Sequence, residues 1–585
     1  MNQLSLFTAA SNNSPAAFVP YVLSEAPADI LAMPDLEIED RIRRAKAVLG
    51  WLMTHYRTSF AVSYGKDSSC VLGLALSAAA EAVARGTHVQ PFVVMTASTK
   101  VENPRIEQLV SSEMAKVRAW ISTHGLPGTV HLASPSLANE FAVSVFGGRA
   151  LPSMAGSKRD CTTSYKIEPM GRLRRHLLGS NNLAKGQFVV QVTGVRADES
   201  VTRAANVKKR AERSDAIVNT SVDANVALAP ILDWTADEVF TYLGLCANQL
   251  ETTYSSFEDV LEIYRDSAGE CYVGLGETAQ DRPACGARTG CWCCLAVQDD
   301  RSMNNMVLQP HNAYMKPLAD FRTFLANTYW DASRRSILGK TIDAEGFLMH
   351  GIDGYSPPML KEMLSYALSI DADEAAAAGA LGIAPRFQIV SLQALFAISA
   401  MWSLYGLHRP FTAFALWREI QAGKRYQIPT VPAFERFPVP SGRRVWVGAV
   451  DDNTGPFDGL RDVLTEAFGG DGCMGTREVK SGGEVLTVSD VNTAPQFTID
   501  EEGASLFLMF EMDEHLDAWH GHASQRLADG NCAGYEYRLY ARYGFLQLAR
   551  GFEGRVDAIL RRSTFKERSG LAAASNPNWA VRHAA

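Results

Sequence analysis

The sequence predicts an α/β protein that begins with a parallel-sheet domain and continues into a cysteine-rich segment, a helical region and a mixed α+β C-terminal domain. Two observations predict this class. Short apolar runs alternate with helical patterns between residues 41 and 250, and such alternation favours a parallel sheet covered by helices on both faces. A loop containing a glycine joins the first apolar run to an apolar helix, an arrangement that suits the binding of an anion.

The elements follow in order along the chain. Residues 1–40 are rich in Ala, Pro, Ser and Asn and are expected to form a flexible leader. Strands are expected at residues 59–63, 88–95, 130–133 and 187–193, with a helix over Val71 to Leu76. We expect the parallel-sheet domain over 41–250, the cysteine segment over 251–310, a helical region ending in a Pro-rich linker over 311–440, and a C-terminal domain over 441–585.

Composition sets limits on the class of protein. The chain has 585 residues, of which 47% are hydrophobic and 21% charged, values typical of a soluble globular protein. A net charge of -8 argues against a surface coated in positive charge for nonspecific nucleic-acid binding, although a local basic groove is compatible with it. The chain has neither an apolar stretch of membrane-spanning length nor a basic region before an apolar one at its start, so we expect a cytoplasmic protein without membrane contact.

The loop after the first strand has the composition of a phosphate-binding turn. It reads Ser63-Tyr64-Gly65-Lys66-Asp67-Ser68. Gly65 lets the backbone approach an anion, and the amides at the start of the following helix point toward it. Lys66 adds a mobile positive charge and Ser68 a hydroxyl donor. The spacing differs from that of a Walker loop, which places four residues between its glycine and a Gly-Lys-Ser/Thr end.

Further motifs accompany the loop in a fixed order. They are Thr96-Ala-Ser-Thr-Lys-Val-Glu-Asn-Pro104, Arg159-Asp-Cys-Thr-Thr-Ser-Tyr-Lys-Ile-Glu-Pro169, Gly194-Val-Arg-Ala-Asp-Glu-Ser200 with Arg203, and Pro230-Ile-Leu-Asp-Trp234. With the loop they resemble the phosphoadenylyl-sulfate reductase family of the PP-loop ATP pyrophosphatases. Tyr64 stands where the family pattern Ser-Gly-Gly-x-Asp-Ser has its first glycine. The resemblance covers roughly residues 41–310 and implies an adenine nucleotide alpha hydrolase-like fold that splits ATP into AMP and pyrophosphate.

The resemblance also implies a set of site residues. The implied catalytic residues are Lys66, Asp67, Cys161 and Lys166, and the implied nucleotide-binding residues are Ser63, Tyr64, Gly65, Ser68, Ser69, Gly194, Arg196, Glu199 and Arg203. The guanidinium groups of Arg196 and Arg203 have the planar shape that holds phosphate oxygens, and Lys166 offers a point charge. Each of these cations by itself is more often part of a surface ion pair.

Five cysteines fall within 24 residues and indicate a soft metal centre. They are Cys271, Cys285, Cys291, Cys293 and Cys294. Closely spaced thiolates repel one another unless a soft cation binds them, so an iron-sulfur cluster or zinc is indicated. Zinc fingers usually pair two Cys-x-x-Cys knuckles, and here only Cys291 and Cys294 have that spacing, which favours a cluster. A set of free buried thiols is the alternative.

The cysteine segment also resembles that of one branch of the family, the DndC-type and Ssp-type sulfurtransferases of bacterial DNA phosphorothioation and phage defence. This resemblance implies that Cys271, Cys285, Cys291 and Cys294 hold a cluster of the 4Fe-4S type, with Cys161 as a further ligand or a sulfur-handling thiol. It leaves open whether Cys293 or Cys294 is the ligand. It further implies ATP and Mg²⁺ as cofactors, and DNA, a cysteine desulfurase and other phosphorothioation proteins as partners.

Other functions remain open at this stage. An assimilatory reductase of phosphoadenylyl or adenylyl sulfate has a related fold, but the Glu-Cys-Gly-x-His tail of those enzymes is missing from this C-terminus. Transfer-RNA thiolation is disfavoured by the motifs at Gly194 and Pro230. A non-catalytic member of a defence complex that binds only nucleotide or DNA would be compatible with Tyr64, whereas Lys66, Asp67 and Ser68 favour an enzyme.

The extreme N-terminus carries an independent signal. Gln3-Leu-Ser-Leu-Phe7 precedes the leader and resembles the short peptide with which bacterial proteins bind the DNA sliding clamp. Two leucines and a phenylalanine on a tail lack a core of their own to fill. We therefore expect a sliding clamp as a further partner.

Overall fold

A computed structural model describes most of the chain in two compact units. The described residues are 21–22, 37–154, 160–179, 188–199, 213–214, 216–219, 226–268, 290–342, 347–436, 444–446, 476–481, 484–489, 496–528, 532–549 and 552–568. The first unit comprises residues 1–97, 105–133 and 170–288, and the second comprises 98–104, 134–169 and 289–585. This grouping differs from the expected domains, because residues 98–104 and 134–169 leave the parallel-sheet unit and join the second one.

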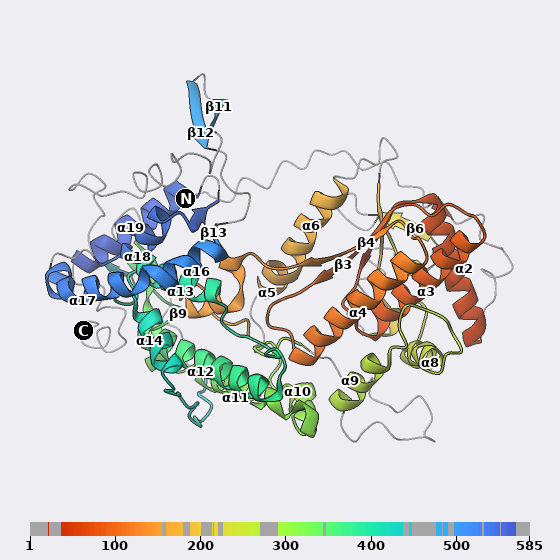
Figure 1. Ribbon diagram of the computed structural model, residues 1–585, viewed down its shortest axis with the longest axis horizontal. Coiled ribbons are helices and arrows are strands. Elements are labelled where there is room, and N and C mark those ends of the chain that lie inside the picture. Colours follow the sequence, from red (N-terminus) through yellow and green to blue (C-terminus); the bar gives the residue numbers. More distant parts are fainter. Residues whose placement is uncertain are drawn as a thin grey trace. The chain divides into compact units, whose positions relative to one another are not determined.

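The first unit is built on a seven-stranded sheet with a parallel centre (Figure 1). The strand order is β1-β6-β7-β5-β2-β3-β4. The bounds are β1 Tyr21–Val22, β2 Thr58–Ala61, β3 Phe92–Ala97, β4 Gly128–Ala133, β5 Val190–Val192, β6 Ala216–Asn219 and β7 Val226–Leu228. The five strands from β7 to β4 run parallel, whereas β6 and β1 pair antiparallel at one edge. The predicted α/β fold class is therefore confirmed.

Helices form a layer against this sheet. The bounds are α2 Ile38–His55, α3 Lys66–Ala84, α4 Pro104–Thr123, α6 Glu168–Leu178, η5 Ala197–Glu199, α8 Ala236–Ala247 and α9 Glu258–Ala268. Helix α3 contacts α2 and α8, and the Trp120 indole of α4 donates to the Leu76 carbonyl of α3 at 3.3 Å. A capping box of Thr235 and Glu238 starts α8, which fixes where the chain turns into that helix.

Two expectations about this unit need qualification. Tyr21 and Val22 fall in the expected flexible leader, yet they form β1 and pair with β6. Most of the leader, including the clamp-like peptide at Gln3, lies outside the described residues. Among the described helices, α3 is long and apolar enough to span a membrane by composition, but 67% of its apolar window is buried, as in the core helix of a globular domain.

The second unit is mainly helical. Its helices are η1 Leu137–Asn139, η2 Ala142–Phe146, α5 Asp160–Thr162, η3 Thr163–Ile167, α10 Arg301–Met306, η7 Pro310–Met315, α11 Lys316–Thr328, η8 Ala332–Arg334, α12 Pro357–Leu381, α13 Leu392–Leu404, α14 Thr412–Gln421, α16 Glu501–Phe510, α17 Met512–Ala528, α18 Tyr535–Arg542 and α19 Glu553–Arg568. Its strands are β8 Arg335–Ile342, β9 Phe347–Tyr355, β10 Arg444–Trp446, β11 Thr476–Ser481, β12 Glu484–Ser489, β13 Phe497–Ile499 and β14 Leu546–Leu548.

The expected helical region contains a β-hairpin. Strands β8 and β9 pair antiparallel and interrupt the helices between α11 and α12. The buried Arg335 at the start of β8 explains part of this hairpin, because its guanidinium lies 4.5 Å from the Tyr329 ring and 5.0 Å from the Tyr355 ring. The Arg335 cation interacts with both aromatic rings, and through Tyr355 it connects the start of β8 to the end of β9.

The expected C-terminal domain is joined to the helical region in the described structure. Helix α13 is apolar on all sides and contacts α14, α16, α18 and α19. The Pro-rich stretch, expected to be a linker, contacts α11 instead, because the Asn327 amide donates to the Val431 carbonyl at 2.9 Å and the Phe434 amide donates to the Asn327 carbonyl at 3.0 Å. Both features place residues 289–585 in one unit.

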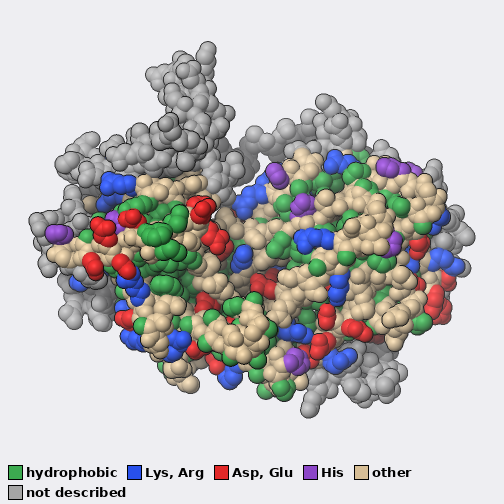
Figure 2. Space-filling model, viewed as in Figure 1, with side chains coloured by type: hydrophobic (Ala, Val, Ile, Leu, Met, Phe, Trp, Pro, Cys, Tyr) green, Lys and Arg blue, Asp and Glu red, His purple; other side chains and the backbone are tan. Residues whose placement is uncertain are grey.

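The surface of this unit carries an exposed apolar face on α16. Leu506, Met509 and Phe510 are 49%, 71% and 68% exposed, and Figure 2 shows hydrophobic side chains gathered on the surface of this unit. Beneath them Phe507 is buried and packs on Phe396 and Tyr540. The two faces of α16 therefore differ, one belonging to the core and the other meeting solvent.

Candidate nucleotide loop and thiol cluster

The predicted phosphate-binding loop lies at the carboxyl end of β2. That strand is paired with β3 on one side and β5 on the other. The chain passes from β2 through α3 to β3, while β5 arrives later on the opposite side. Ligands of open α/β sheets bind where the strand order reverses in this way. The loop and the Gly194 turn that follows β5 therefore meet at the position where the fold favours a ligand.

Hydrogen bonds within the loop hold its backbone in place. The Ser63 amide donates to the Ser68 hydroxyl at 3.3 Å, and the Gly65 amide donates to the Ser63 hydroxyl at 3.4 Å. The Ser68 hydroxyl donates to the Gly65 carbonyl at 3.1 Å, and the Ser69 amide donates to the same carbonyl at 2.9 Å. The bond from the Ser69 amide closes the first turn of α3. Ser69 itself is fully buried.

Tyr64 adopts the conformation that the family pattern reserves for glycine. Its φ is +55°, in the left-handed region that side chains disfavour. The side chain is completely buried, and this burial raises the pKa of its hydroxyl well above the usual range. Tyr64 therefore fills the core beneath the loop, and any contact of this residue with a nucleotide would come from its main chain.

Asp67 connects the two cations of the loop. Its carboxylate accepts from Lys66 Nζ at 2.6 Å and from Arg196 Nε at 2.6 Å. Arg196 is 2% exposed and also donates to the Trp234 carbonyl at 3.1 Å. Arg196 thus holds the Asp67 carboxylate in this structure, and its contact with a nucleotide phosphate stays a prediction. Lys66 is the more mobile of the two and lies at the start of α3.

Gly194 allows the turn after β5 to approach the loop. A Cβ atom on this residue would lie 3.0 Å from the Asp67 carbonyl carbon and oxygen and 3.0 Å from the Ser68 nitrogen. Real Cβ atoms rarely come so close to backbone, so only glycine fits without displacement. The Gly-x-Arg motif and the loop are therefore in direct backbone contact. Glu199 ends η5 in the same motif, and Arg203 lies outside the described residues.

A residue that the sequence motifs do not include also contacts the loop. The Tyr264 hydroxyl of α9 accepts from the Lys66 amide at 3.3 Å, and its ring centroid lies 5.9 Å from Lys66 Nζ. The ring packs edge-on against Phe240 of α8 at 5.6 Å. Tyr264 lies in an ordinary amphipathic helix, so the sequence offered no signal for it.

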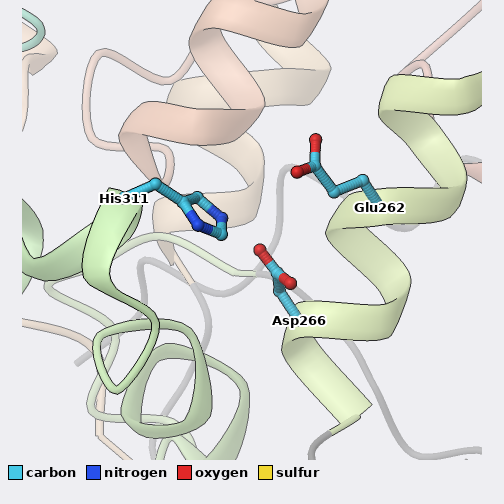
Figure 3. Close-up of side chains that lie close together, drawn as sticks. All are labelled: Glu262, Asp266 and His311. Carbon is cyan, nitrogen blue, oxygen red and sulfur yellow. The ribbon is translucent and has the colours of Figure 1, made fainter.

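Two carboxylates lie one helical turn apart on α9. Figure 3 draws Glu262 and Asp266 on the same side of this helix. The Glu262 carboxylate accepts a hydrogen bond from the Arg105 guanidinium at 3.0 Å within the first unit, so the charge of Glu262 is part of an ion pair. His311, drawn in the same figure, belongs to the second unit and is described with η7.

The described cysteines of the predicted centre lie in the second unit. They are Cys161 of α5 and Cys291, Cys293 and Cys294 of the turn before α10. Cys293 interacts electrostatically with the other three thiols, so the structure brings together cysteines 130 residues apart in the sequence. Cys271 and Cys285 lie outside the described residues.

The turn that carries the cysteines is firmly held. The Trp292 amide donates to the Val101 carbonyl at 3.0 Å, and the Cys294 amide donates to the Cys291 carbonyl at 3.0 Å. The buried Arg322 of α11 donates to the Cys294 carbonyl at 3.0 Å and to the Val297 carbonyl at 2.7 Å. The Trp292 ring stacks on Phe321 at 5.9 Å. The thiols therefore project from a fixed backbone.

The three cysteines of the turn differ in their exposure to solvent. Cys293 is 5% exposed, whereas Cys291 and Cys294 are partly exposed. Burial raises the pKa of Cys293 well above its usual range and raises that of Cys291 to about 12, where Glu102 adds to the effect and Lys166 opposes it. These raised pKa values favour the protonated thiol at Cys291 and Cys293. Such a set suits a soft metal that replaces the protons.

Lys166 accompanies the thiols. It is the penultimate residue of the π-helix η3, and its Nζ contacts the Glu102 carboxylate at 3.1 Å. Burial would lower the pKa of Lys166, but Glu102 and then Cys291 raise it above the usual value. The Thr99 hydroxyl lies 3.5 Å from Cys291 Sγ. Thr99 and Glu102 come from the motif after β3, which the sequence analysis noted without assigning roles to them.

The described thiols are the type of ligand that an iron-sulfur cluster requires. Cys161, Cys291 and Cys294 are partly exposed, and each interacts electrostatically with the buried Cys293. Thiolate sulfur is the ligand that iron-sulfur clusters require. The remaining predicted ligands, Cys271 and Cys285, complete the set only in sequence.

Comparison with known proteins gives one family match. Residues 57–254, about a third of the chain, match the family described as "Phosphoadenosine phosphosulfate reductase domain". The match covers the loop, the Gly194 motif and the turn of the Pro230 motif after β7. It supports the resemblance to this family and, for this region, an enzyme of the nucleotide-using, sulfur-metabolism type.

Solved structures and curated proteins give no further support for a function of this chain. One solved structure, the Candida glabrata FMN adenylyltransferase in complex with FMN and the ATP analogue AMPCPP, covers 42% of this chain and 68% of its own, with 16% identity and a TM-score of 0.24. At that TM-score the likeness carries no argument. No curated protein matches the chain.

Proposed function

We propose that this protein is an ATP pyrophosphatase that adenylates a backbone phosphate of DNA and supports the insertion of sulfur there. The observation that carries the proposal is the Asp67 arrangement, in which one carboxylate holds both Lys66 and the buried Arg196 at the carboxyl end of β2. Paired with the family match over residues 57–254, it supports a loop organised for the phosphates of ATP.

The chemistry assigned to the loop is a phosphate displacement. A nonbridging oxygen of the DNA backbone attacks the α-phosphorus of ATP, and the bond to the β-phosphate oxygen breaks to release pyrophosphate. Amides at the start of α3 and the Lys66 ammonium stabilise the negative charge that collects on pyrophosphate. Asp67 holds Lys66 in place until ATP arrives. Mg²⁺ is expected to share the phosphate charge.

The thiols are assigned to the sulfur side of the reaction. Cys271, Cys285, Cys291 and Cys294 would hold an iron-sulfur cluster, which supplies electrons or sulfur-handling capacity when bound. Lys166 and Glu102 form an ion pair beside Cys291 and Cys161, and we assign them the orientation of the groups that reach these thiols. Cys293 is assigned to the core because it is buried.

The first test measures sulfur in DNA. Anaerobically purified protein is incubated with DNA, ATP, Mg²⁺, cysteine and a cysteine desulfurase, and nuclease digests are analysed by mass spectrometry. We expect phosphorothioate-linked dinucleotides with the wild type and none with Lys66→Ala. The same reaction run on Cys291→Ser should lose both the product and the visible absorption of the protein. Cys246→Ser, which removes a buried thiol of α8, should retain both.

A reductase of adenylyl or phosphoadenylyl sulfate is the second candidate, because the matched family carries that name. The same protein preparation distinguishes the two. Formation of sulfite from adenylyl sulfate without DNA, together with unmodified DNA in the first test, would favour the reductase. The DNA proposal requires the opposite pair of results.

The docking of the N-terminal peptide on a sliding clamp, like a cytoplasmic location, stays a prediction. The peptide Gln3 to Phe7 is tested by deleting residues 1–8 and measuring binding to the purified clamp. Loss of binding is expected, while pyrophosphate release remains unchanged.

A further inference from the structure

We propose that the Tyr264 hydroxyl competes with nucleotide phosphates for the Lys66 amide of the loop and thereby promotes release of pyrophosphate. The inference rests on the proposed function, since it assigns a role to a residue at that same loop. It adds a residue that belongs to none of the sequence motifs.

The first observation is the contact itself. The Lys66 amide is the first amide of α3, and amides at this position are the donors that an anion meets at a helix N-terminus. Here its hydrogen bond goes to the Tyr264 hydroxyl oxygen at 3.3 Å. A phosphate oxygen bound to the same amide would need the space that the hydroxyl fills, so the two acceptors exclude each other.

The second observation is that the hydroxyl lies over the loop and not merely beside one atom. A Cβ built on Gly65 would come 3.3 Å from the Tyr264 hydroxyl, so the glycine leaves room for this oxygen. The Lys66 ammonium lies 5.9 Å from the centroid of the same ring. Tyr264 therefore bonds to the amide of the loop and lies near its glycine and its ammonium group, the three parts that would meet a phosphate.

The third observation concerns how Tyr264 is carried. The base of α9 is fixed, because the Ser255 hydroxyl donates to the buried Glu113 at 2.9 Å and the Phe257 amide donates to Ser255 at 3.1 Å. The Tyr264 ring itself is partly exposed and packs edge-on against Phe240. A change of its side-chain rotamer can thus free the amide while the helix stays in place.

The functional consequence is a loop that does not retain its product. Pyrophosphate has the same anionic oxygens as ATP but lacks the adenosine contacts. An internal acceptor that returns to the Lys66 amide weakens binding of both ligands by the same factor. This lowers product inhibition, while the adenosine part of ATP preserves substrate binding.

The test removes the hydroxyl and keeps the ring. Pyrophosphate, a nonhydrolysable ATP analogue and adenosine are titrated into the full-length wild type and into Tyr264→Phe by calorimetry. One hydrogen bond of competition corresponds to tighter binding by about two- to tenfold. We expect this gain for pyrophosphate and for the ATP analogue, with the affinity for adenosine unchanged. The inhibition constant of pyrophosphate in the turnover assay should fall by the same factor.

The control is Tyr426→Phe, which removes a hydroxyl that donates to Glu419 at the surface of the second unit. It should bind all three ligands like the wild type. Equal or weaker binding of pyrophosphate by Tyr264→Phe, with normal binding by the wild type, would overturn this inference alone. Failure of both proteins to bind pyrophosphate and the ATP analogue would instead overturn the proposed function, and this inference with it.

Discussion

At the scale of single residues, the loop is specified by close contacts that allow few substitutes. Asp67 accepts from two cations, Gly194 leaves room for the loop backbone, and Tyr64 holds a left-handed conformation while filling the core. A backbone conformation of this kind costs on the order of 1–3 kcal/mol and persists only where its surroundings impose it. The buried Tyr64 ring supplies such surroundings, because its burial offsets the strain.

The first prediction concerns Gly194. In Gly194→Ala the new Cβ would meet the Asp67 and Ser68 backbone at 3.0 Å, so α3 or the turn must shift. We expect a loss of about 1–3 kcal/mol in the free energy of unfolding and a pyrophosphate release rate reduced at least tenfold. Gly244→Ala is the matched control, since a Cβ there meets no atom within 4 Å in a helix. Equal activity of the two variants would contradict the role assigned to this contact.

Much of the loop was predictable from sequence, and the reason is local. Ser63, Gly65, Lys66 and Ser68 are neighbours along the chain, and a strand-loop-helix pattern alone places them at a helix start. The contacts of Arg196 and Tyr264 with the loop could not be predicted, because they depend on how separate elements pack together. A planar guanidinium can hold phosphate or carboxylate, and nothing in the sequence indicates that Arg196 pairs with Asp67.

At the scale of elements, the cysteine turn and the helix with Cys161 show what sequence spacing can and cannot establish. The spacing of Cys291 and Cys294 predicted a shared ligand turn, and the turn is present. The proximity of Cys161 was implied only by the family resemblance, and the structure supports it through the interaction with Cys293. The hairpin of β8 and β9 was missed because its apolar residues alternate irregularly around two bulged registers.

A second element-scale feature is a buried carboxyl between α13 and α18. Glu536 is 1% exposed and accepts from the Ser399 hydroxyl at 2.5 Å and from the Tyr540 hydroxyl at 2.6 Å. Burial raises its pKa from 4.5 to about 7, although both hydroxyls oppose this shift. The fold thus favours the protonated carboxyl, and its stabilising contribution is complete below about pH 4.5 and lost as the pH rises through about 7.

The second prediction follows from the direction of this pKa shift. Between pH 5 and pH 8 the wild type should lose about 2 kcal/mol more unfolding free energy than Glu536→Gln, which cannot ionise. Urea unfolding at the two pH values measures the difference. Glu514→Gln, an exposed change on α17, should follow the wild type. Parallel pH profiles for the wild type and Glu536→Gln would show that this carboxyl does not titrate in the stated range.

At the scale of the whole molecule, the two candidate sites belong to different units. The nucleotide loop, Asp67 and Tyr264 belong to the parallel-sheet unit, and the described thiols with Lys166 and Glu102 belong to the helical unit. The chain passes between the units after β3, at the start of α4, after β4, within α6 and again at residue 289. Apolar periodicity in the sequence indicates each element and not the contacts between elements, so it carries no information on this grouping. The proposed adenylation therefore depends on the first unit, and the proposed sulfur chemistry on the second.

The most direct test of the central claim is the identity of the products formed from ATP. Full-length protein, Mg²⁺ and DNA are incubated with ATP labelled in the adenosine part, and the nucleotides and phosphates are separated and quantified. The account predicts AMP, free or on DNA, and pyrophosphate in equal amounts, with both lost in Lys66→Ala and both retained in Cys291→Ser supplied with the same DNA. Formation of ADP and phosphate, or unchanged cleavage in Lys66→Ala, would contradict it.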